Sequence, residues 1–124
     1  TIETLDIDPK ATATYIADLT QNNSDKITDN RFDIVLCTEV LEHVLQPLDA
    51  VKEIHRILKP GGVALITTPY NFRIHGPLPD CWRFTEHGLR ALFSKGFEVK
   101  ELVAVETEDR FLMPIHYRLV AQKI

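Results

Sequence analysis

The feature that most constrains the fold of this chain is a strand–helix–strand pattern at its centre. The nearly continuous apolar run FDIVLC at residues 32–37 is typical of a strand buried on both faces. Helical spacing of apolar side chains then starts at Pro47 and stops at Pro60, before a Gly-Gly turn. The run VALITTP at residues 63–69 predicts a second buried strand. Because such connections are right-handed, we expect a βαβ unit within an open α/β sheet.

Weaker patterns on both sides complete the predicted α/β fold. We expect short strands at residues 4–7 and 13–17, a loop at 70–84, a helix from Thr85 to Gly96, and strands at 97–106 and 116–124. The last two strands follow each other without a helix, which favours an antiparallel pair. The prediction is therefore a single domain, residues 1–124, with a mostly parallel sheet and an antiparallel C-terminal strand pair.

Composition narrows the classes of function. The net charge is −4 and no block of Lys and Arg is present, so the basic footprint of a nucleic-acid-binding protein is missing. The longest apolar run is too short to span a membrane, and no signal peptide is evident. Cys37 and Cys81 lack the spacing of a disulfide framework or a metal site. We therefore expect a cytoplasmic protein with a small-molecule partner and no nucleic-acid partner.

Polar residues follow four of the predicted strands, including the run VALITTP, and we expect these strand ends to converge on one crevice, where open α/β sheets bind ligands. Asp6 ends the first strand, Asp18 and Leu19 follow the second, and Cys37 and Thr38 follow the third. The Asp6 carboxylate could hold two ribose hydroxyls, since a carboxylate accepts several hydrogen bonds. Asp18 could accept a hydrogen bond from an adenine-like amine while Leu19 packs on the ring. Each aspartate alone is more often a turn former or helix cap.

The loop at residues 70–84 is the second candidate region, because long loops in compact domains are often lids or binding loops. It carries His75, Asp80, Trp82 and Arg83 within nine residues. Trp82 could stack on a sugar or on a cofactor base, and Arg83 could bind a phosphate or carboxylate. The structural alternative is that Trp82 and Phe84 pin the loop to the core and that Asp80 and Arg83 form a structural pair.

The central segment FDIVLCTEVLEHVLQPLDAVKEIHRILKPGGVALITTP resembles class I S-adenosylmethionine-dependent methyltransferases. The resemblance is to the branch that methylates small molecules, with type 11-like features, and it covers about residues 3–100. The stretch HGPLPDCWRFTEHGL is similar to a subgroup often associated with bacterial cell-surface sugar pathways, with Cys81 where tyrosine is commoner. The resemblance implies a Rossmann-like sheet and methyl transfer from S-adenosylmethionine to a small molecule, such as a sugar or sugar-linked lipid.

The resemblance also implies roles for individual cofactor-binding residues. Asp6 matches the acid that binds the cofactor ribose, and Asp18 and Leu19 match the pair beside the adenine. Cys37 and Thr38 lie where the backbone meets the methionine moiety of the cofactor.

His43 is the predicted catalytic residue. It matches the Leu-Glu-His histidine of the family, which lies near the transferred methyl group in some members. An imidazole suits general-base chemistry, although His43 could equally cap or pack the short helix. Glu39 and Glu42 are predicted to be polar residues on a helix surface. The spacing of His43, His75 and Cys81 does not indicate zinc, so the expectation is that no metal is bound.

The chain departs from the family at its beginning, because the sequence holds no Gly-x-Gly-x-Gly turn. In the family that turn follows a first strand, which lies between the second and fourth strands. We expect a fragment, or a gap filled by direct pairing of residues 2–7 with 32–37 or by a homodimer through the exposed sheet edge. One alternative is an inactive methyltransferase-like interaction module. A nicotinamide-dependent oxidoreductase is the weakest alternative, because its glycine fingerprint is also missing.

Overall fold

The computed structural model describes residues 1–106 and 108–124, and its main unit is a four-stranded mixed sheet with strand order β3-β4-β6-β5. The strands are β3 (Phe32–Thr38), β4 (Leu58–Pro69), β5 (Phe97–Val105) and β6 (His116–Lys123). β3 and β4 are parallel, whereas β6 is antiparallel to both β4 and β5. This arrangement confirms the predicted α/β class and the antiparallel C-terminal strand pair.

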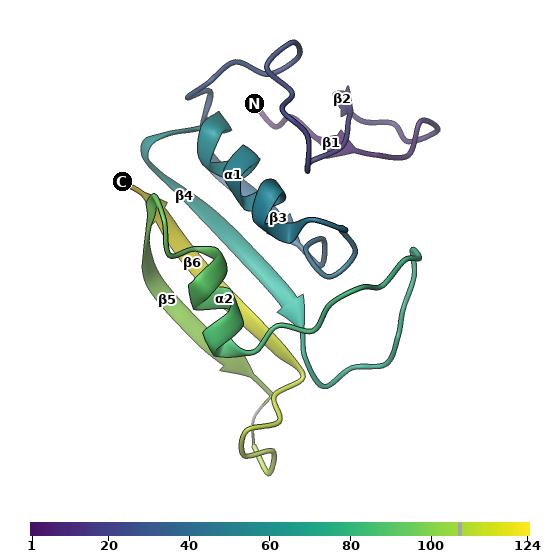
Figure 1. The fold of residues 1–124 in the computed structure, drawn as a ribbon, viewed down its shortest axis with the longest axis vertical. Helices are drawn as coiled ribbons and strands as arrows, with labels where there is room; N and C mark the ends of the chain where they lie inside the picture. Colours follow the sequence, from purple (N-terminus) through teal and green to yellow (C-terminus); the bar gives the residue numbers. More distant parts are fainter. Residues whose placement is uncertain (107) are drawn as a thin grey trace.

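Two helices, α1 (Pro47–Ile57) and α2 (Glu86–Leu92), lie on the same face of this sheet (Figure 1). The core between helices and sheet includes Ile54, Ile66 and Leu119, all with almost no exposed surface. The expectation that the third predicted strand is buried on both faces is wrong. Ile34 and Leu36 of β3 are 59% and 69% exposed. Both described helices cover the other face of the sheet, so the β3 side chains that point away from the helices remain exposed to solvent.

The N-terminal strands β1 (Leu5–Asp6) and β2 (Tyr15–Ile16) form a separate, parallel pair. The predicted direct pairing of residues 2–7 with 32–37 is therefore wrong. β1 instead uses β2 as its hydrogen-bonding partner, and the pair stands apart from the four-stranded sheet in Figure 1. An ion pair of 2.6 Å between Glu3 and Arg31 links this pair to the residue that precedes β3.

The segment between β2 and β3 is tied to α1 by buried polar groups. The backbone N–H of Asn23 donates to the Glu53 carboxylate at 2.7 Å. The Arg56 guanidinium binds the same carboxylate through two hydrogen bonds of 2.7 and 2.9 Å and donates to the carbonyl of Ile27 at 2.8 Å. These bonds fix the segment that begins at Asp18 against the helix.

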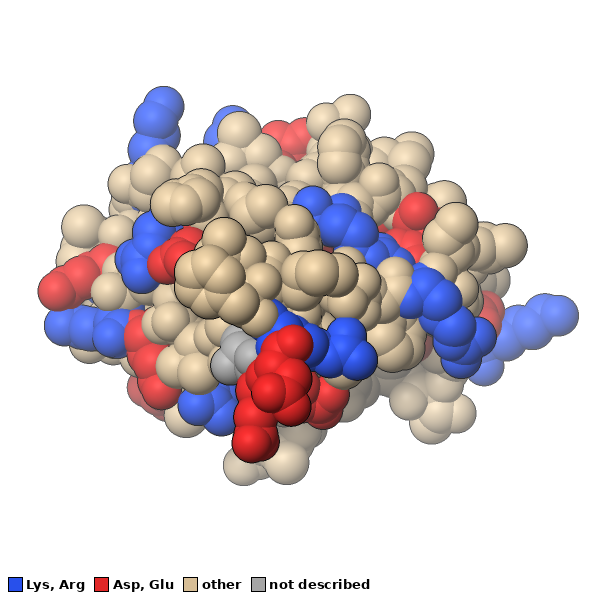
Figure 2. Space-filling view, turned by 90° about the horizontal axis from the view of Figure 1, so that it is seen from below, with Lys and Arg blue, Asp and Glu red and all other residues tan. Residues whose placement is uncertain are grey.

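Surface charge is mixed on the face that Figure 2 presents, where acidic and basic side chains are interspersed over a mostly uncharged surface. Among the described residues of this face, no single sign of charge dominates, so it offers no field to steer a highly charged ligand. No helix in the described part of the chain has both the length and the apolar composition to cross a membrane.

The junction of α1 and β4 differs from the prediction, because α1 ends at Ile57 and β4 begins at once with Leu58. Leu58 pairs with Phe32 and Val63 pairs with Ile34, so the intervening Gly-Gly turn is a bulge within β4. A Cβ atom on Gly62 would lie 2.9 Å from the carbonyl oxygens of both Asp33 and Lys59. Only glycine therefore fits this position without a backbone shift.

We expect Gly62→Ala to lower the free energy of unfolding by about 1–3 kcal/mol, because rigid backbone atoms would have to move. Chemical denaturation followed by circular dichroism measures the change. Gly88→Ala in α2 is the matched control, since its Cβ would meet nothing closer than 3.6 Å. That change should raise the free energy of unfolding by about 0.4–1 kcal/mol. Equal effects of the two substitutions would contradict the close packing at Gly62.

Candidate functional site

The candidate site is built on the irregular turn of residues 39–45, which joins β3 to α1. Glu39 opens the turn with a positive φ of 56°, and its N–H donates to the Thr67 carbonyl of β4 at 3.0 Å. The Glu42 side chain is fully buried, so the prediction of a polar residue on a helix surface is wrong. Residues 41–43 form a turn rather than a helix, and the loop at residues 70–84 covers them.

Hydrogen bonds hold the loop at residues 70–84 on this turn. The N–H groups of Cys81 and Trp82 both donate to the Glu42 carbonyl, at 2.7 and 3.0 Å. The indole N–H of Trp82 donates to the Val44 carbonyl at 2.7 Å, and Nδ1 of His43 lies 3.0 Å from the Pro79 carbonyl oxygen. Trp82 therefore pins the loop to the turn, while Phe84, the other residue of the structural alternative, packs against the hydrophobic core. The ring is still 42% exposed, so stacking on a ligand stays a prediction.

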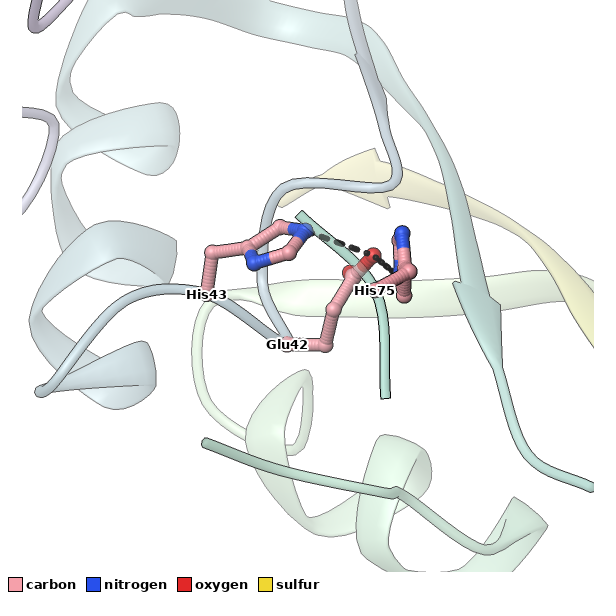
Figure 3. Close-up of side chains that lie close together, drawn as sticks. All are labelled: Glu42, His43 and His75. Atoms are coloured by element: carbon pink, nitrogen blue, oxygen red, sulfur yellow. Dashed lines mark ion pairs between the residues drawn. The ribbon is translucent and has the colours of Figure 1, made fainter. Parts of the chain in front are cut away.

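Glu42 and His43 of the turn form a close cluster with His75 of the loop (Figure 3). Oε2 of Glu42 lies 3.5 Å from Nε2 of His43 and 3.3 Å from Nε2 of His75. Within the described residues, neither Glu42 oxygen nor Nε2 of His75 has a hydrogen-bond partner. Burial raises the pKa of Glu42, and the neighbouring Glu39 carboxylate raises it further. The structure thus joins the predicted catalytic histidine to a predicted substrate-binding histidine through a buried carboxylate.

Asp80 and Arg83 shape the loop around His75. The Arg83 guanidinium donates to the two Asp80 oxygens at 2.7 and 2.9 Å, and to the Arg73 carbonyl at 2.8 Å. Asp80 also accepts a hydrogen bond from the backbone N–H of His75 at 2.9 Å. The hydrogen bonds from Arg83, followed by that from His75, hold the pKa of Asp80 well below its usual range. The predicted structural pair is present, and contact with substrate stays a prediction.

The residues predicted to bind the ribose and the adenine lie in or directly after the N-terminal strand pair of β1 and β2. Oδ1 of Asp6 accepts the N–H of Asp8 at 2.9 Å, and Oδ1 of Asp18 accepts both the N–H and the hydroxyl of Thr20. Both carboxylates therefore act as turn formers. Leu19 packs against the main hydrophobic core. Their predicted roles in binding a cofactor are not tested by these contacts.

Cys37 and Thr38 lie instead at the carboxyl end of β3, in the four-stranded sheet. Burial raises the pKa of the Cys37 thiol to about 12, with a further contribution from Glu42. This buried thiol is therefore protonated at neutral pH and is a poor nucleophile. The side chain of Thr38 is exposed. The strand ends that were expected to share one crevice thus belong to two separate sheets, and the cofactor roles of these residues stay predictions.

Comparison with known proteins places this fold in a family. Residues 1–102 match the model of a family described as a methyltransferase domain. The ubiquinone biosynthesis O-methyltransferase of Pseudomonas aeruginosa (strain UCBPP-PA14) is 45% identical over 38 residues. Those residues are 31% of this chain and 16% of that protein, so the chain spans about a sixth of this curated relative.

Solved structures share the fold. The S-adenosylmethionine-dependent methyltransferase from Mesorhizobium loti is 17% identical with a TM-score of 0.65, over 94% of this chain and 72% of the other. A Sulfolobus solfataricus protein described as a type 11 methyltransferase is 21% identical with a TM-score of 0.64, over 96% and 68% of the two chains. Since the family model matches most of the sequence, the chain belongs to the methyltransferase domain family.

Proposed function

We propose that the protein transfers the methyl group of S-adenosylmethionine to an oxygen or nitrogen of a small molecule, such as a sugar or sugar-linked lipid. The observation that carries this proposal is the position of the buried cluster. Glu42 and His43 follow the carboxyl end of β3, and His75 follows the carboxyl end of β4. The carboxyl ends of parallel strands are where open α/β sheets bind their ligands.

The proposed cofactor site uses the residues that the sequence indicates. The Asp6 carboxylate would bind the ribose hydroxyls, Asp18 and Leu19 would lie beside the adenine, and the backbone at Cys37 and Thr38 would meet the methionine moiety. In the reaction, a lone pair on the acceptor attacks the methyl carbon, and the electrons of the broken carbon–sulfur bond stay on sulfur. Positioning of the two reactants supplies much of the rate enhancement in such a step.

The proposed acceptor site lies under the loop at residues 70–84. Trp82 and Phe72 are 42% and 39% exposed, so both rings have apolar surface available to the C–H face of a sugar. The proton that the acceptor loses needs a base or solvent. The role of His43 as that base stays a prediction, because its Nε2 faces Glu42 in this structure.

The test is calorimetric titration of S-adenosylhomocysteine into this chain. We expect micromolar binding, and Asp6→Ala should weaken it by about 10- to 100-fold, as the loss of charge-assisted hydrogen bonds predicts. Asp8→Ala is a matched control, because Oδ1 of Asp8 makes the same kind of turn bond, to the N–H of Lys10. It should leave the affinity unchanged. No binding up to millimolar ligand would favour the inactive interaction module instead.

A further inference from the structure

We propose that Glu42, His43 and His75 bind a divalent transition-metal ion such as Zn²⁺. Two imidazole nitrogens and one carboxylate oxygen are the protein ligands of several zinc and non-haem iron sites, in which a further position stays open. The cluster offers these donors, one from each residue, and its ligand atoms all lie within 4.8 Å of one another. The proposal is independent of cofactor binding.

The distances within the cluster suit a small ion. Ligands about 2.0–2.1 Å from a tetrahedral zinc ion lie roughly 3.3 Å from each other. The Glu42 oxygen lies 3.3 Å from His75 Nε2 and 3.5 Å from His43 Nε2. Figure 3 shows both imidazole rings turned toward this carboxylate from opposite sides. The two carboxylate–imidazole distances therefore already match a bound ion, whereas the set as a whole spans up to 4.8 Å. Rotation of the imidazole side chains would have to bring the two histidine nitrogens closer together to complete the coordination.

The protonation pattern of His43 also favours an ion. Its Nδ1 lies 3.0 Å from the Pro79 carbonyl oxygen, which can only accept a hydrogen bond, so Nδ1 carries the proton. In the neutral ring, the lone pair on Nε2 then points toward the Glu42 carboxylate. Metal-binding histidines are held in this way, by a hydrogen bond from the other ring nitrogen to a carbonyl or carboxylate. The proposal thus assigns Nε2 of His43 to metal binding rather than to proton transfer.

A cation also explains why a fully buried carboxylate has no hydrogen bond. Both oxygens of Glu42 and Nε2 of His75 are buried without a partner among the residues described. Without an ion, both Nε2 atoms must carry a proton to donate to Glu42, and for His43, whose Nδ1 already donates to Pro79, this requires the protonated ring. An ion between the three groups would instead bind Oε2 of Glu42 and the Nε2 lone pairs of two neutral histidines. The side chains of His43 and His75 are 13% and 20% exposed, which leaves a route for an ion to enter.

This proposal departs from the sequence-based expectation that no metal is bound. That expectation rested on the spacing of His43, His75 and Cys81 along the chain. The structure instead completes the set with Glu42, which sequence analysis assigned to a helix surface. Cys81 stays outside the set, because its sulfur makes a weak contact of 3.9 Å with the His43 carbonyl oxygen.

The test uses the chain after treatment with EDTA and transfer to metal-free buffer. Calorimetric titration with Zn²⁺ should show one ion per chain, and Co²⁺ should give visible absorption typical of a tetrahedral site. Glu42→Gln and His75→Ala should each weaken Zn²⁺ binding on the order of 100-fold or more, at least as much as the loss of a supporting hydrogen bond does. These two variants change different segments, and circular dichroism establishes that each is folded.

His87→Ala is the matched control, because it removes an exposed histidine of α2 and should leave Zn²⁺ affinity unchanged. Mg²⁺ should not compete, since it prefers oxygen ligands. Equal Zn²⁺ affinity in His75→Ala and His87→Ala would overturn the proposal. A cobalt–thiolate absorption band that disappears in Cys81→Ser would also overturn it, because the ligand set would then be different. Absence of Zn²⁺ binding to the unsubstituted chain would overturn it directly.

Discussion

Arg56→Met should lower the free energy of unfolding by about 3–5 kcal/mol, the cost of leaving a buried charge without its partner. Glu53 is 5% exposed, and Arg56 supplies two of the hydrogen bonds to its carboxylate. Methionine keeps most of the apolar stem of arginine, so the loss reports on the polar contacts of the guanidinium, with Glu53, Asp29 and the Ile27 carbonyl, rather than on packing. Chemical denaturation at pH 7 measures the effect.

The pH dependence of this loss provides an independent check. Burial by itself would raise the pKa of Glu53, but hydrogen bonds from Arg56 and from the Asn23 N–H outweigh it, and the net pKa is lowered. In the unsubstituted protein this group therefore stabilises the fold above its ordinary pKa, and the contribution is lost as pH falls through the folded-state pKa. Without Arg56 the carboxyl is protonated more readily, so the difference between the two proteins should narrow from pH 7 to pH 4.

Arg90→Met is the control for an exposed ion pair. Nε of Arg90 lies 3.6 Å from Oε2 of Glu86, and both side chains are about half exposed. Its effect should stay within about 0.5 kcal/mol. The Arg56 substitution should also weaken binding of S-adenosylhomocysteine, because it frees the segment that begins at Asp18. A loss of stability in Arg56→Met no larger than in Arg90→Met would show that the pair does not hold this segment.

The central βαβ unit could be predicted from sequence because its apolar runs reflect local physics. Apolar side chains at helical spacing and a proline at the first helical position led directly to α1, and continuous apolar runs led to β3 and β4. The exposure of Ile34 could not be predicted in this way. A continuous apolar run indicates which residues can be buried. Whether they are buried depends on which other segments cover each face of the sheet.

The site was predicted in parts, since its key contact joins residues far apart in sequence. His43 was singled out by the family resemblance and His75 by its residue type within the loop, but their approach depends on how the loop at residues 70–84 folds back on the turn. Glu42 was missed because a charged side chain was assigned to a helix surface, whereas residues 41–43 form a turn that buries it. One signal was available: Glu42 lies beside Leu41 and close to Val44, within a stretch apolar enough to be buried.

Leu41→Ala should lower the free energy of unfolding by about 2–5 kcal/mol, because it opens a cavity at a side chain with no exposed surface. Leu41 belongs to the hydrophobic core and precedes Glu42 directly, so it anchors the turn that carries the proposed metal ligands. Denaturation of the metal-free protein measures this stability. A second titration with Zn²⁺ should show weaker binding, because a loosened turn no longer holds Glu42 and His43 in place.

Leu45→Ala distinguishes this anchoring from a general effect of shortening a leucine in the same turn. Leu45 is 67% exposed, so its truncation removes little buried surface. Both the stability and the Zn²⁺ affinity should then stay close to those of the unsubstituted chain, with a change in stability within about 0.5 kcal/mol. If Leu41→Ala lost stability but kept its Zn²⁺ affinity, the ligands would be held by the loop at residues 70–84 alone. The contacts of that loop with Glu42 and Val44 would then be sufficient to position the cluster.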